Sequence, residues 1–514
     1  MSPTQDIHKD ARDLARGALL SHLGTVAKVS KFLFVLVAAR AYGPAALGYY
    51  FLAWNVVDIA SKFGLWGVDR SLIRDIARYN VDESDHTKST LFGILRFNLS
   101  IAVGLSLVTT AVLLYASRAI AQGIFHDLQM LAPLRLLAAA LPFVVLTQAL
   151  IATTKALRFV RYEVLVRQGI EPLVLLLVMV ALIPFSWGAV GLVLAHVFAS
   201  MIGTLAAATV ALTKFRFVGW HPRSLAAAIK RDTLRFTSPL AAMDVLNLTV
   251  ARVDIMLVGA LLNAAAAGSY GIAIEIISLI KRIRQGFEPV FSPIVAELHY
   301  GEQESRLRRN YVIVTRWLLA GTLPTVIAIG LFPTQLLSLF NDEAKVAAGA
   351  LMVLALGHGL LAVFSASETL LVMTGKSWLN TFLAASSLTL SAAVGILLIP
   401  KLGIVGGALG TLVGYAFVSG ARVLQGHRLM GLHPFGYTLL WPVVVALLTT
   451  TIVYALNLAI TVDSAAKLIV MLVITAVIYG GGFFGGAREP EERQLIARLR
   501  ARLAGGPNER SETP

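Results

Sequence analysis

Residues 237–297 read TSPLAAMDVLNLTVARVDIMLVGALLNAAAAGSYGIAIEIISLIKRIRQGFEPVFSPIVAE. The stretch consists of two long apolar segments joined at Ala260–Ala267, each long enough to cross a bilayer as a helix. Charged residues interrupt both segments: Arg252, Asp254, Glu275, Lys281, Arg282, Arg284 and Glu288. A charge at the bilayer centre costs roughly 2.5–3.5 kcal/mol on insertion scales, so such helices usually turn their charges toward a bundle interior or a water-filled cavity. This stretch therefore predicts a helical hairpin that forms one wall of a polar pathway.

An earlier part of the chain resembles this hairpin. Ala46–Tyr50 reads ALGYY and Ala266–Tyr270 reads AAGSY, so the second copy lies 220 positions after the first. Other pairs follow in the same order at offsets of 215 to 221: Ala152–Lys155 with Met373–Lys376, and Gly188–Gly191 with Gly403–Gly406. Transporters are often built from internal repeats with the substrate site between them. The sequence therefore predicts a duplicated architecture.

The composition places the chain in a membrane. It is 57% hydrophobic and only 14% charged, whereas a soluble domain carries about a quarter charged residues. We expect an all-α polytopic membrane protein with about fourteen spans, near 17–41, 43–66, 89–116, 129–154, 163–183, 188–213, 233–259, 265–298, 308–332, 346–373, 379–399, 404–426, 435–458 and 464–485.

The duplication groups these spans into larger parts. We predict an N-terminal lobe of six helices at 1–220, a C-terminal lobe of six helices at 228–430, a further helix pair at 435–485 and a basic cytoplasmic tail at 486–514. Residues 1–16 are polar and of mixed sign, and the first apolar run is too long for a signal peptide and lacks a cleavage pattern. It is interpreted as the first span.

The net charge of +15 is explained by topology. With a cytoplasmic N-terminus, the outer loops have only Arg40, Arg118, Lys345, Lys401 and Lys467. The inner loops hold many more basic residues: Arg70, Arg74, Arg78, Lys88, Lys155, Arg158, Arg161, Lys214, Arg216, Arg223, Lys230, Arg231, Arg306, Arg308, Arg309, Lys376, Arg422 and Arg428. This is the positive-inside pattern, and it predicts a multi-pass protein of the cell (inner or plasma) membrane with both termini cytoplasmic. Nucleic acid is not an expected partner.

Covalent catalysis is not expected. The chain has no Cys, and it contains no His-Glu-x-x-His, no Gly-x-Ser-x-Gly elbow and no glycine-rich phosphate loop after a strand. We therefore predict that the protein is not an enzyme and uses no cofactor and no metal.

Charges within the first two predicted spans are candidates for substrate binding. Lys28 and Lys31 continue a polar stripe down the first span, and two ammonium groups one turn apart repel each other unless an anion lies nearby. That anion is either a phosphate-bearing substrate or a carboxylate such as Asp58 on a neighbouring helix. Asp58 and Lys62 stand four residues apart, which favours a structural pair.

The later spans add further candidates. Arg252 and Asp254 lie on different faces of a helix, so Arg252 needs a partner from elsewhere. Lys281, Arg284 and Glu288 share a face; a pair between Arg284 and Glu288 would leave Lys281 for a ligand, and snorkelling to the cytoplasmic surface is the alternative. Lone ionisable groups within spans, His196, His358 and Glu368, are interpreted as hydrogen-bonded structural residues, with Glu368 also a candidate proton carrier.

The expected site thus has two parts. The predicted substrate-binding cations are Lys28, Lys31, Lys62, Arg252, Lys281 and Arg284. The candidates for ion coupling are Asp58, Asp254 and Glu368.

Three motifs together resemble a known family. They are Ala41-Tyr42-Gly43-Pro44 with Leu47–Tyr50, Val253-Asp254 with Ala267–Tyr270, and Leu398–Ala408, which reads LIPKLGIVGGA. This set resembles the polysaccharide-transport, or O-antigen flippase, family of the multidrug/oligosaccharidyl-lipid/polysaccharide exporter superfamily. The related peptidoglycan-precursor flippases have arginines in the first span, where this chain has lysines.

The resemblance implies a function and its partners. It implies a flippase that moves a polyprenyl-diphosphate-linked oligosaccharide from the cytoplasmic to the outer leaflet for O-antigen or exopolysaccharide biosynthesis. The two lobes would rock about a cationic cleft, with the lipid bilayer as solvent and a polysaccharide polymerase or glycosyltransferases as further candidate partners. The alternatives are a drug or cation antiporter of the same superfamily and a non-transporting membrane scaffold for glycan assembly.

Overall fold

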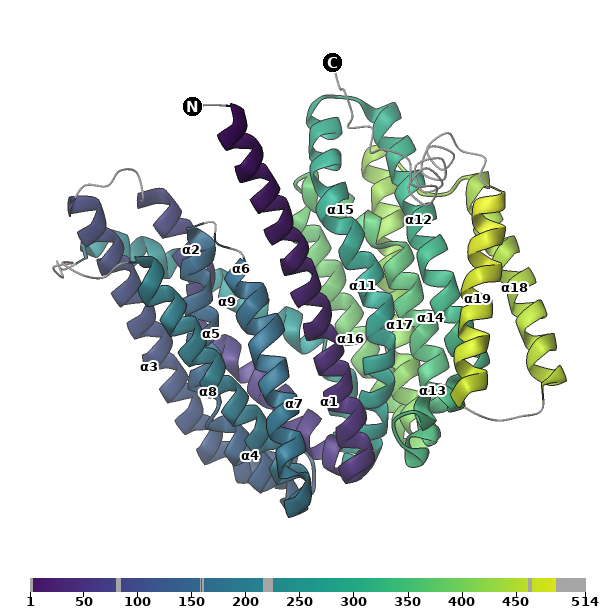
Figure 1. Cartoon of the computed structure of the whole chain (residues 1–514), viewed down its shortest axis with the longest axis horizontal. Coiled ribbons are helices and arrows are strands. Elements are labelled where there is room, and N and C mark those ends of the chain that lie inside the picture. The colour runs from purple at the N-terminus through teal and green to yellow at the C-terminus, as the bar shows by residue number, and fades with distance from the viewer. Residues whose placement is uncertain are drawn as a thin grey trace. The chain divides into compact units, whose positions relative to one another are not determined.

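The computed structural model describes residues 3–79, 85–157, 159, 161–215, 225–460 and 465–486, without the side chains of 3–29, 85, 86, 214, 215, 247 and 465. Every regular element in these ranges is a helix, and no strand occurs in them (Figure 1). The all-α fold class predicted from the sequence is confirmed.

Two compact units make up the chain. Unit 1 consists of Met1–Glu275, Phe340–Ala347 and Ala392–Gly410, and unit 2 of Ile276–Leu339, Ala348–Ser391 and Thr411–Pro514. Three long helices, α11, α16 and α17, begin in one unit and end in the other. The units therefore differ in their boundaries from the predicted lobes, which remain a prediction.

Unit 1 is built around α1, which contacts helices along the whole first half of the chain. Its elements are α1 (Pro3–Leu65), α2 (Val68–Tyr79), α3 (Asp85–Gly123), η1 (Leu128–Met130), α4 (Leu131–Ala138), α5 (Leu141–Ala156), α6 (Arg161–Glu163), η2 (Val164–Ile170), α7 (Glu171–Leu182), η3 (Ile183–Phe185), α8 (Gly188–Phe215), α9 (Ala227–Val250), α10 (Val253–Leu261) and η4 (Asp342–Ala347). Helix α8 packs against both α5 and α7.

The two long segments of α1 meet at a kink. Gly43 has φ 76° and ψ 172°, a conformation that glycine reaches without steric cost, and Pro44 follows it. The kink separates the two spans predicted at 17–41 and 43–66.

Helices α9 and α10 correspond to the span predicted at 233–259, but the structure divides that span. A turn at Ala251 and Arg252 separates the helices, and Arg252 has φ −127° and ψ −8°. Asp254 then lies in the first turn of α10, where its Oδ1 accepts a hydrogen bond from the Ile255 amide at 2.8 Å. A carboxylate in this place complements the partial positive charge of a helix N-terminus.

Two glycines related by the sequence repeat lie against each other in unit 1. A Cβ on Gly48 would overlap the Ala264 carbonyl and lie 3.0 Å from the Gly268 nitrogen, and a Cβ on Gly268 would overlap the Pro44 carbonyl and lie 2.9 Å from the Gly48 nitrogen. The four residues form two pairs, each separated by the same 220 positions as the repeat. Corresponding helices of the two repeats therefore cross backbone to backbone at corresponding residues.

Unit 2 is organised around α12, which packs against α14 and against the C-terminal pair α18 and α19 (Figure 1). Its elements, together with the helices it shares, are α11 (Ala264–Tyr300), α12 (Glu304–Leu331), α13 (Pro333–Ser338), α14 (Ala348–Val363), α15 (Ser365–Met373), α16 (Ser377–Leu402), α17 (Ile404–Met430), η5 (Tyr437–Leu439), α18 (Leu440–Ala459) and α19 (Ala465–Gly485). Ala320, Val445 and Phe483 are buried where α12, α18 and α19 meet.

Within the described residues, 12 helical stretches are long and apolar enough to cross a membrane. The predicted count of fourteen is not confirmed. Ser30–Tyr79, which contains the kink of α1, forms one continuous stretch, and the interrupted segment Ala227–Leu261 is not among the 12.

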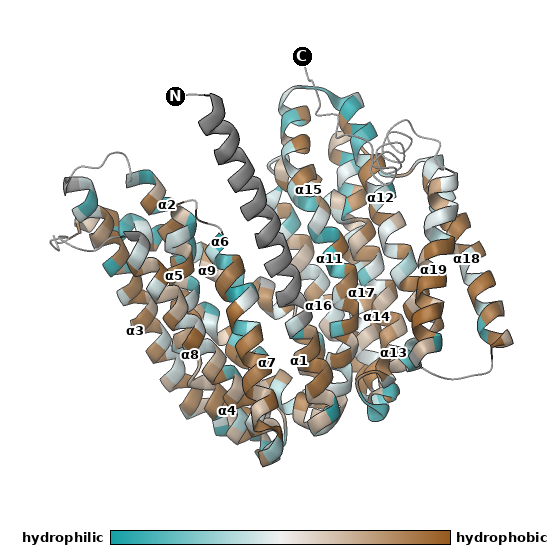
Figure 2. Cartoon of the chain, viewed as in Figure 1, coloured by the Kyte–Doolittle hydropathy of each residue, from teal (hydrophilic) through white to brown (hydrophobic). Residues whose placement is uncertain are grey.

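Apolar residues make up much of these helices (Figure 2), and many large apolar side chains on them are exposed. On α3, Leu107, Val108 and Val112 are exposed, and on α19 Ile469 and Val477 are exposed. Exposed apolar surface of this extent is incompatible with water and suits lipid chains. The chain is a multi-pass membrane protein.

The glycine crossing gives a first prediction. Gly268→Ala should destabilise the protein by about 1–3 kcal/mol or more, because the new methyl group meets backbone atoms that cannot rotate away. Thermal unfolding in detergent should show a lower Tm than for the unchanged chain. Gly286→Ala is the matched control on the same helix, since a Cβ there meets nothing within 4 Å. Equal Tm values for the two variants would contradict the crossing.

Candidate functional site

A cluster of charged side chains lies within the membrane helices of unit 1. Arg252, at the break between α9 and α10, pairs with Asp58 of α1 at 3.3 Å, and Lys31 of α1 pairs with Glu275 of α11 at 3.9 Å. In both pairs the carboxylate is the more buried partner: the side chains are 33% exposed for Arg252, 15% for Asp58, 63% for Lys31 and 10% for Glu275. In both pairs the cation is therefore more accessible than the carboxylate.

The arginine of this cluster retains an unused donor. Its Nε is buried and has no hydrogen-bond acceptor in the described part of the chain. A guanidinium is a fork of five N–H donors, so one edge can hold Asp58 while Nε remains directed at a further acceptor. A buried N–H without an acceptor costs about 1–3 kcal/mol, and a bound anion would remove that cost.

Aromatic residues surround the same place. The hydroxyl of Tyr50 lies within the electrostatic reach of Arg252, Glu275 and Asp58, and it hydrogen-bonds His196 Nδ1 at 2.9 Å. The ring of Trp54 also contacts this histidine, with ring centroids 4.1 Å apart. The interpretation of His196 as a hydrogen-bonded residue agrees with this contact.

The other predicted residues of unit 1 lie in different surroundings. Lys62 donates to Gln148 Oε1 at 3.1 Å, so the predicted pair of Asp58 with Lys62 is replaced by the pair with Arg252. Asp254 Oδ2 accepts a hydrogen bond from the Tyr270 hydroxyl at 3.2 Å. Lys28 belongs to α1, but its side chain lies outside the described residues.

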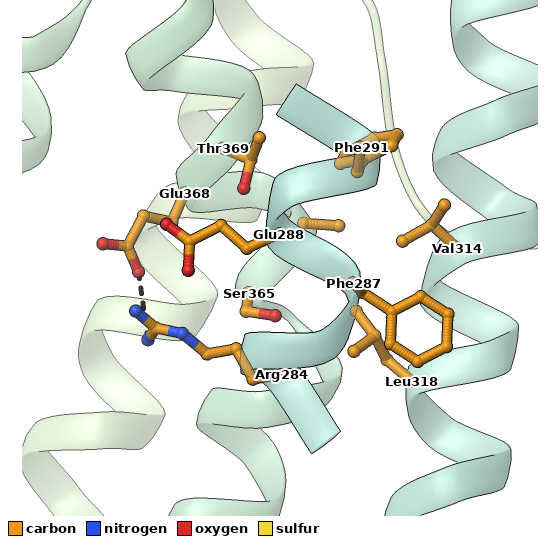
Figure 3. Close-up of a pocket in the computed structure, with 10 residues that line it drawn as sticks. Arg284, Phe287, Glu288, Phe291, Val314, Leu318, Ser365, Glu368 and Thr369 are labelled. Carbon is orange, nitrogen blue, oxygen red and sulfur yellow. Dashed lines mark ion pairs between the residues drawn. The ribbon is translucent and has the colours of Figure 1, made fainter. Parts of the chain in front are cut away.

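Unit 2 holds a second cluster, centred on Glu368 of α15. Its Oε2 lies 3.3 Å from Arg284 of α11 and 2.9 Å from Arg422 of α17, and Arg422 also donates to Asn380 at 2.9 Å. Figure 3 marks the pair of Arg284 with Glu368 and none between Arg284 and Glu288, the partner considered from the sequence. Two arginines thus share one carboxylate, and the three side chains carry a net positive charge.

The two arginines differ in exposure. The side chain of Arg422 is 6% exposed and that of Arg284 is 29% exposed. Lys281, one turn before Arg284, lies near enough to His358 to act on it electrostatically, as does Arg284. The hollow lined by Arg284, Glu288 and Glu368 holds only about 10 Å³, which is room for a water molecule at most (Figure 3).

Sequence reasoning missed Arg422 and Glu275 as members of these clusters. Arg422 was assigned to an inner loop, although a carboxylate such as Glu368 within a span requires a buried cation nearby.

Within the described ranges, no group of three His, Asp or Glu side chains converges where a metal ion could be held.

Basic residues of the predicted inner loops also have partners. Arg74 pairs with Asp75 at 2.6 Å and with Asp232 at 3.0 Å, and Arg70 with Asp244 at 2.5 Å. These pairs tie α2 to α9 within unit 1. Arg70 and Arg74, which are predicted from the sequence to lie in an inner loop, thus connect two helices.

The buried arginine of unit 2 gives a second prediction. Arg422→Met should lower stability by about 1–3 kcal/mol, because Glu368 and Asn380 lose their principal donor. Thermal unfolding should detect the loss, and Glu368→Gln in the same chain should recover part of it by removing the carboxylate charge. Arg428→Met is the control, since Arg428 is exposed on the same helix. A control variant as unstable as Arg422→Met would refute a specific role for the buried pair.

The fold is similar to that of several solved membrane transporters. A structure of "Lipid II flippase MurJ, inward closed conformation" matches with a TM-score of 0.73 at 12% identity, covering 95% of this chain and 99% of that one. An inward-facing multidrug resistance transporter of the MATE family of the MOP superfamily matches with a TM-score of 0.63 at 14% identity, covering 80% and 94%. A MOP superfamily transporter from Pyrococcus furiosus, described as having a binding pocket of reverse polarity, matches with a TM-score of 0.53 at 15% identity, covering 80% of this chain and 93% of that one.

The sequence identifies the family. Residues 37–341, more than half of the chain, match the family described as "Polysaccharide biosynthesis protein", and no curated protein matches in sequence. The chain belongs to this family of polysaccharide biosynthesis proteins. The resemblance drawn from the three sequence motifs is confirmed.

Proposed function

We propose that this protein is a flippase that moves a polyprenyl-diphosphate-linked oligosaccharide from the cytoplasmic to the outer leaflet by alternating access. Support comes from the polysaccharide biosynthesis family and from the transporter fold. The glycan would serve a cell-surface polysaccharide such as O-antigen or exopolysaccharide. Proteins that build this polymer, a polymerase or glycosyltransferases, are the corresponding candidate partners.

The observation that carries the proposal is the accessibility of the cations in unit 1. Lys31 is 63% exposed at the start of Ser30–Tyr79, a helical stretch long and apolar enough to cross a membrane, and its contact with Glu275 is long at 3.9 Å. An ammonium group so placed is stable only in a polar volume or beside an anion. Glu275 is a distant partner at 3.9 Å, and a diphosphate would bind Lys31 more closely, because phosphate oxygens form strong charge-assisted hydrogen bonds with Lys and Arg.

Arg252 suits a diphosphate for a second reason. It stands at a helix break, and discontinuous membrane helices commonly form substrate sites in transporters because their free backbone groups face a cavity. Its Nε is the donor without an acceptor, so a phosphate oxygen can bind there while Asp58 keeps its own contact. The guanidinium then bridges a carboxylate and a phosphate.

Unit 2 has a candidate phosphate-binding cation of its own in Arg284. Because Arg422 is closer to Glu368 and more buried, it can neutralise that carboxylate alone. Arg284 is then able to leave Glu368 for a phosphate without exposing an unpaired charge. Lys281 on the same helix would add a second positive group.

The alternatives receive different support. An antiporter would need a carboxylate that is available for an ion, but Asp58, Asp254 and Glu368 each contact a donor in the structure. The pairing of Arg252 and Arg284 is the observation that favours a non-transporting scaffold. A transport assay distinguishes the two from a flippase.

The test is translocation of a fluorescent polyprenyl-diphosphate oligosaccharide in proteoliposomes. Lys31→Ala with Arg252→Gln should slow it about 100-fold or more, because two charge-assisted hydrogen bonds are lost and each is worth about 1.5–3 kcal/mol. Adding Asp58→Asn removes the carboxylate that has lost its partner, so stability should return while transport stays slow. This result would separate a loss of substrate binding from a loss of folding. Lys401→Glu is the control, an exposed cation outside the cluster. Normal transport by the double variant, or none by the folded unchanged chain with several glycans, would refute the proposal.

The predicted orientation, in an inner membrane with cytoplasmic termini, is testable separately. The chain has no Cys, so single-cysteine variants report one position each. Ser377→Cys, in a predicted inner loop, should react with an impermeant maleimide only after cells are opened. Ser186→Cys, in a predicted outer loop, should react in intact cells. Both serines are exposed, so the reverse pattern would invert the topology.

A further inference from the structure

An open apolar groove lies on unit 2, and none of its lining residues belongs to either charged cluster. It has a volume of about 630 Å³ and lies between α14 and α17, beside the segment that precedes η5. Leu360, Phe364, Val423 and Leu424 form its walls, and Phe435 closes one side with its ring 6.1 Å from that of Phe364. The volume is within the range of pockets that hold small ligands, about 300–1,000 Å³.

One end of this groove is polar and basic. His427 and His433 line it with ring centroids 5.8 Å apart, and Arg308 of α12 lies 3.1 Å from His433 Nε2. An arginine only donates hydrogen bonds, so Nε2 of His433 must accept, and the ring proton is therefore on Nδ1. This Nδ1 is buried and has no acceptor among the described residues.

A donor of this kind beside a guanidinium points to an anionic oxygen. The ligand should also carry a hydrocarbon chain, because the apolar side chains of Leu360, Leu424 and Phe435 in the groove are exposed. A phosphate headgroup on an acyl chain has both features, whereas a soluble anion has only the first. Basic pockets between membrane helices at the cytoplasmic side are known as sites for anionic lipid headgroups.

We propose that this groove binds one anionic phospholipid of the adjacent leaflet. The phosphate accepts hydrogen bonds from His433 Nδ1 and from Arg308, and one acyl chain lies along α14 and α17. By the predicted topology, this is the cytoplasmic leaflet. The proposal depends on the residues of unit 2 and is independent of the proposed transport function.

Glycine 420 offers a way to block the groove without disturbing the fold. Gly420 lines the groove, and a Cβ there meets nothing within 4 Å. Gly420→Leu should therefore fill the space that the acyl chain occupies. Gly481→Leu on α19 is the matched control, because that glycine is equally open and lies outside the groove.

Native mass spectrometry of the whole detergent-purified chain tests the proposal with phosphatidylglycerol and phosphatidylcholine of equal chain length. The unchanged chain and Gly481→Leu should retain one phosphatidylglycerol in preference to phosphatidylcholine. Gly420→Leu should reduce that retention about tenfold or more, because the new side chain fills the space of the acyl chain. The double variant Arg308→Gln with His433→Ala should reduce it by a similar factor, because the phosphate loses charge-assisted hydrogen bonds.

Three results would overturn the proposal. Equal retention of the two lipids would remove the role of the anionic headgroup. Unchanged retention by Gly420→Leu would place the lipid elsewhere. Displacement of phosphatidylglycerol from the groove by a polyprenyl phosphate at a much lower concentration would assign the groove to that lipid instead.

Discussion

Most of this structure depends on how charges are accommodated inside apolar helices. A lone charge in the membrane interior is expensive, so each described charge of the two clusters lies beside an opposite charge from another element. Arg252 and Asp58 are 194 positions apart in the chain, and their pair joins the break between α9 and α10 to α1. The requirement to neutralise buried charge thus fixes helix packing as well as the candidate site.

The second constraint is the close crossing of repeated helices. Gly48 and Gly268 bring two backbones into contact because neither residue has a Cβ, and small residues at crossings are the usual means of packing helices where no hydrophobic effect drives them together. The crossing lies a few residues from Glu275 and from Tyr50 along the same helices. The repeat therefore positions the charged cluster of unit 1 through its glycines.

The sequence was sufficient for the fold class because hydropathy and glycine-proline signals are local. The boundary predicted between the spans 17–41 and 43–66 lies beside the kink of α1 at Gly43 and Pro44. Ala251 and Arg252 carry no comparable signal, since both residues favour helices, and the division of α9 from α10 was not predicted. The same limit applies to the site: Lys62 was assigned to Asp58 by helical spacing, but Asp58 pairs with an arginine distant in the chain.

The two clusters solve one electrostatic problem in different ways. A ligand phosphate that took a cation from a buried carboxylate would leave that carboxylate uncompensated, which costs several kcal/mol. At Arg252 the unused Nε allows a ligand to bind while the contact with Asp58 persists. At Glu368 the second arginine, Arg422, stays behind when Arg284 moves. In the proposed flippase, each cluster can therefore engage and release a diphosphate at low cost, which suits a substrate that must be bound on one side and freed on the other.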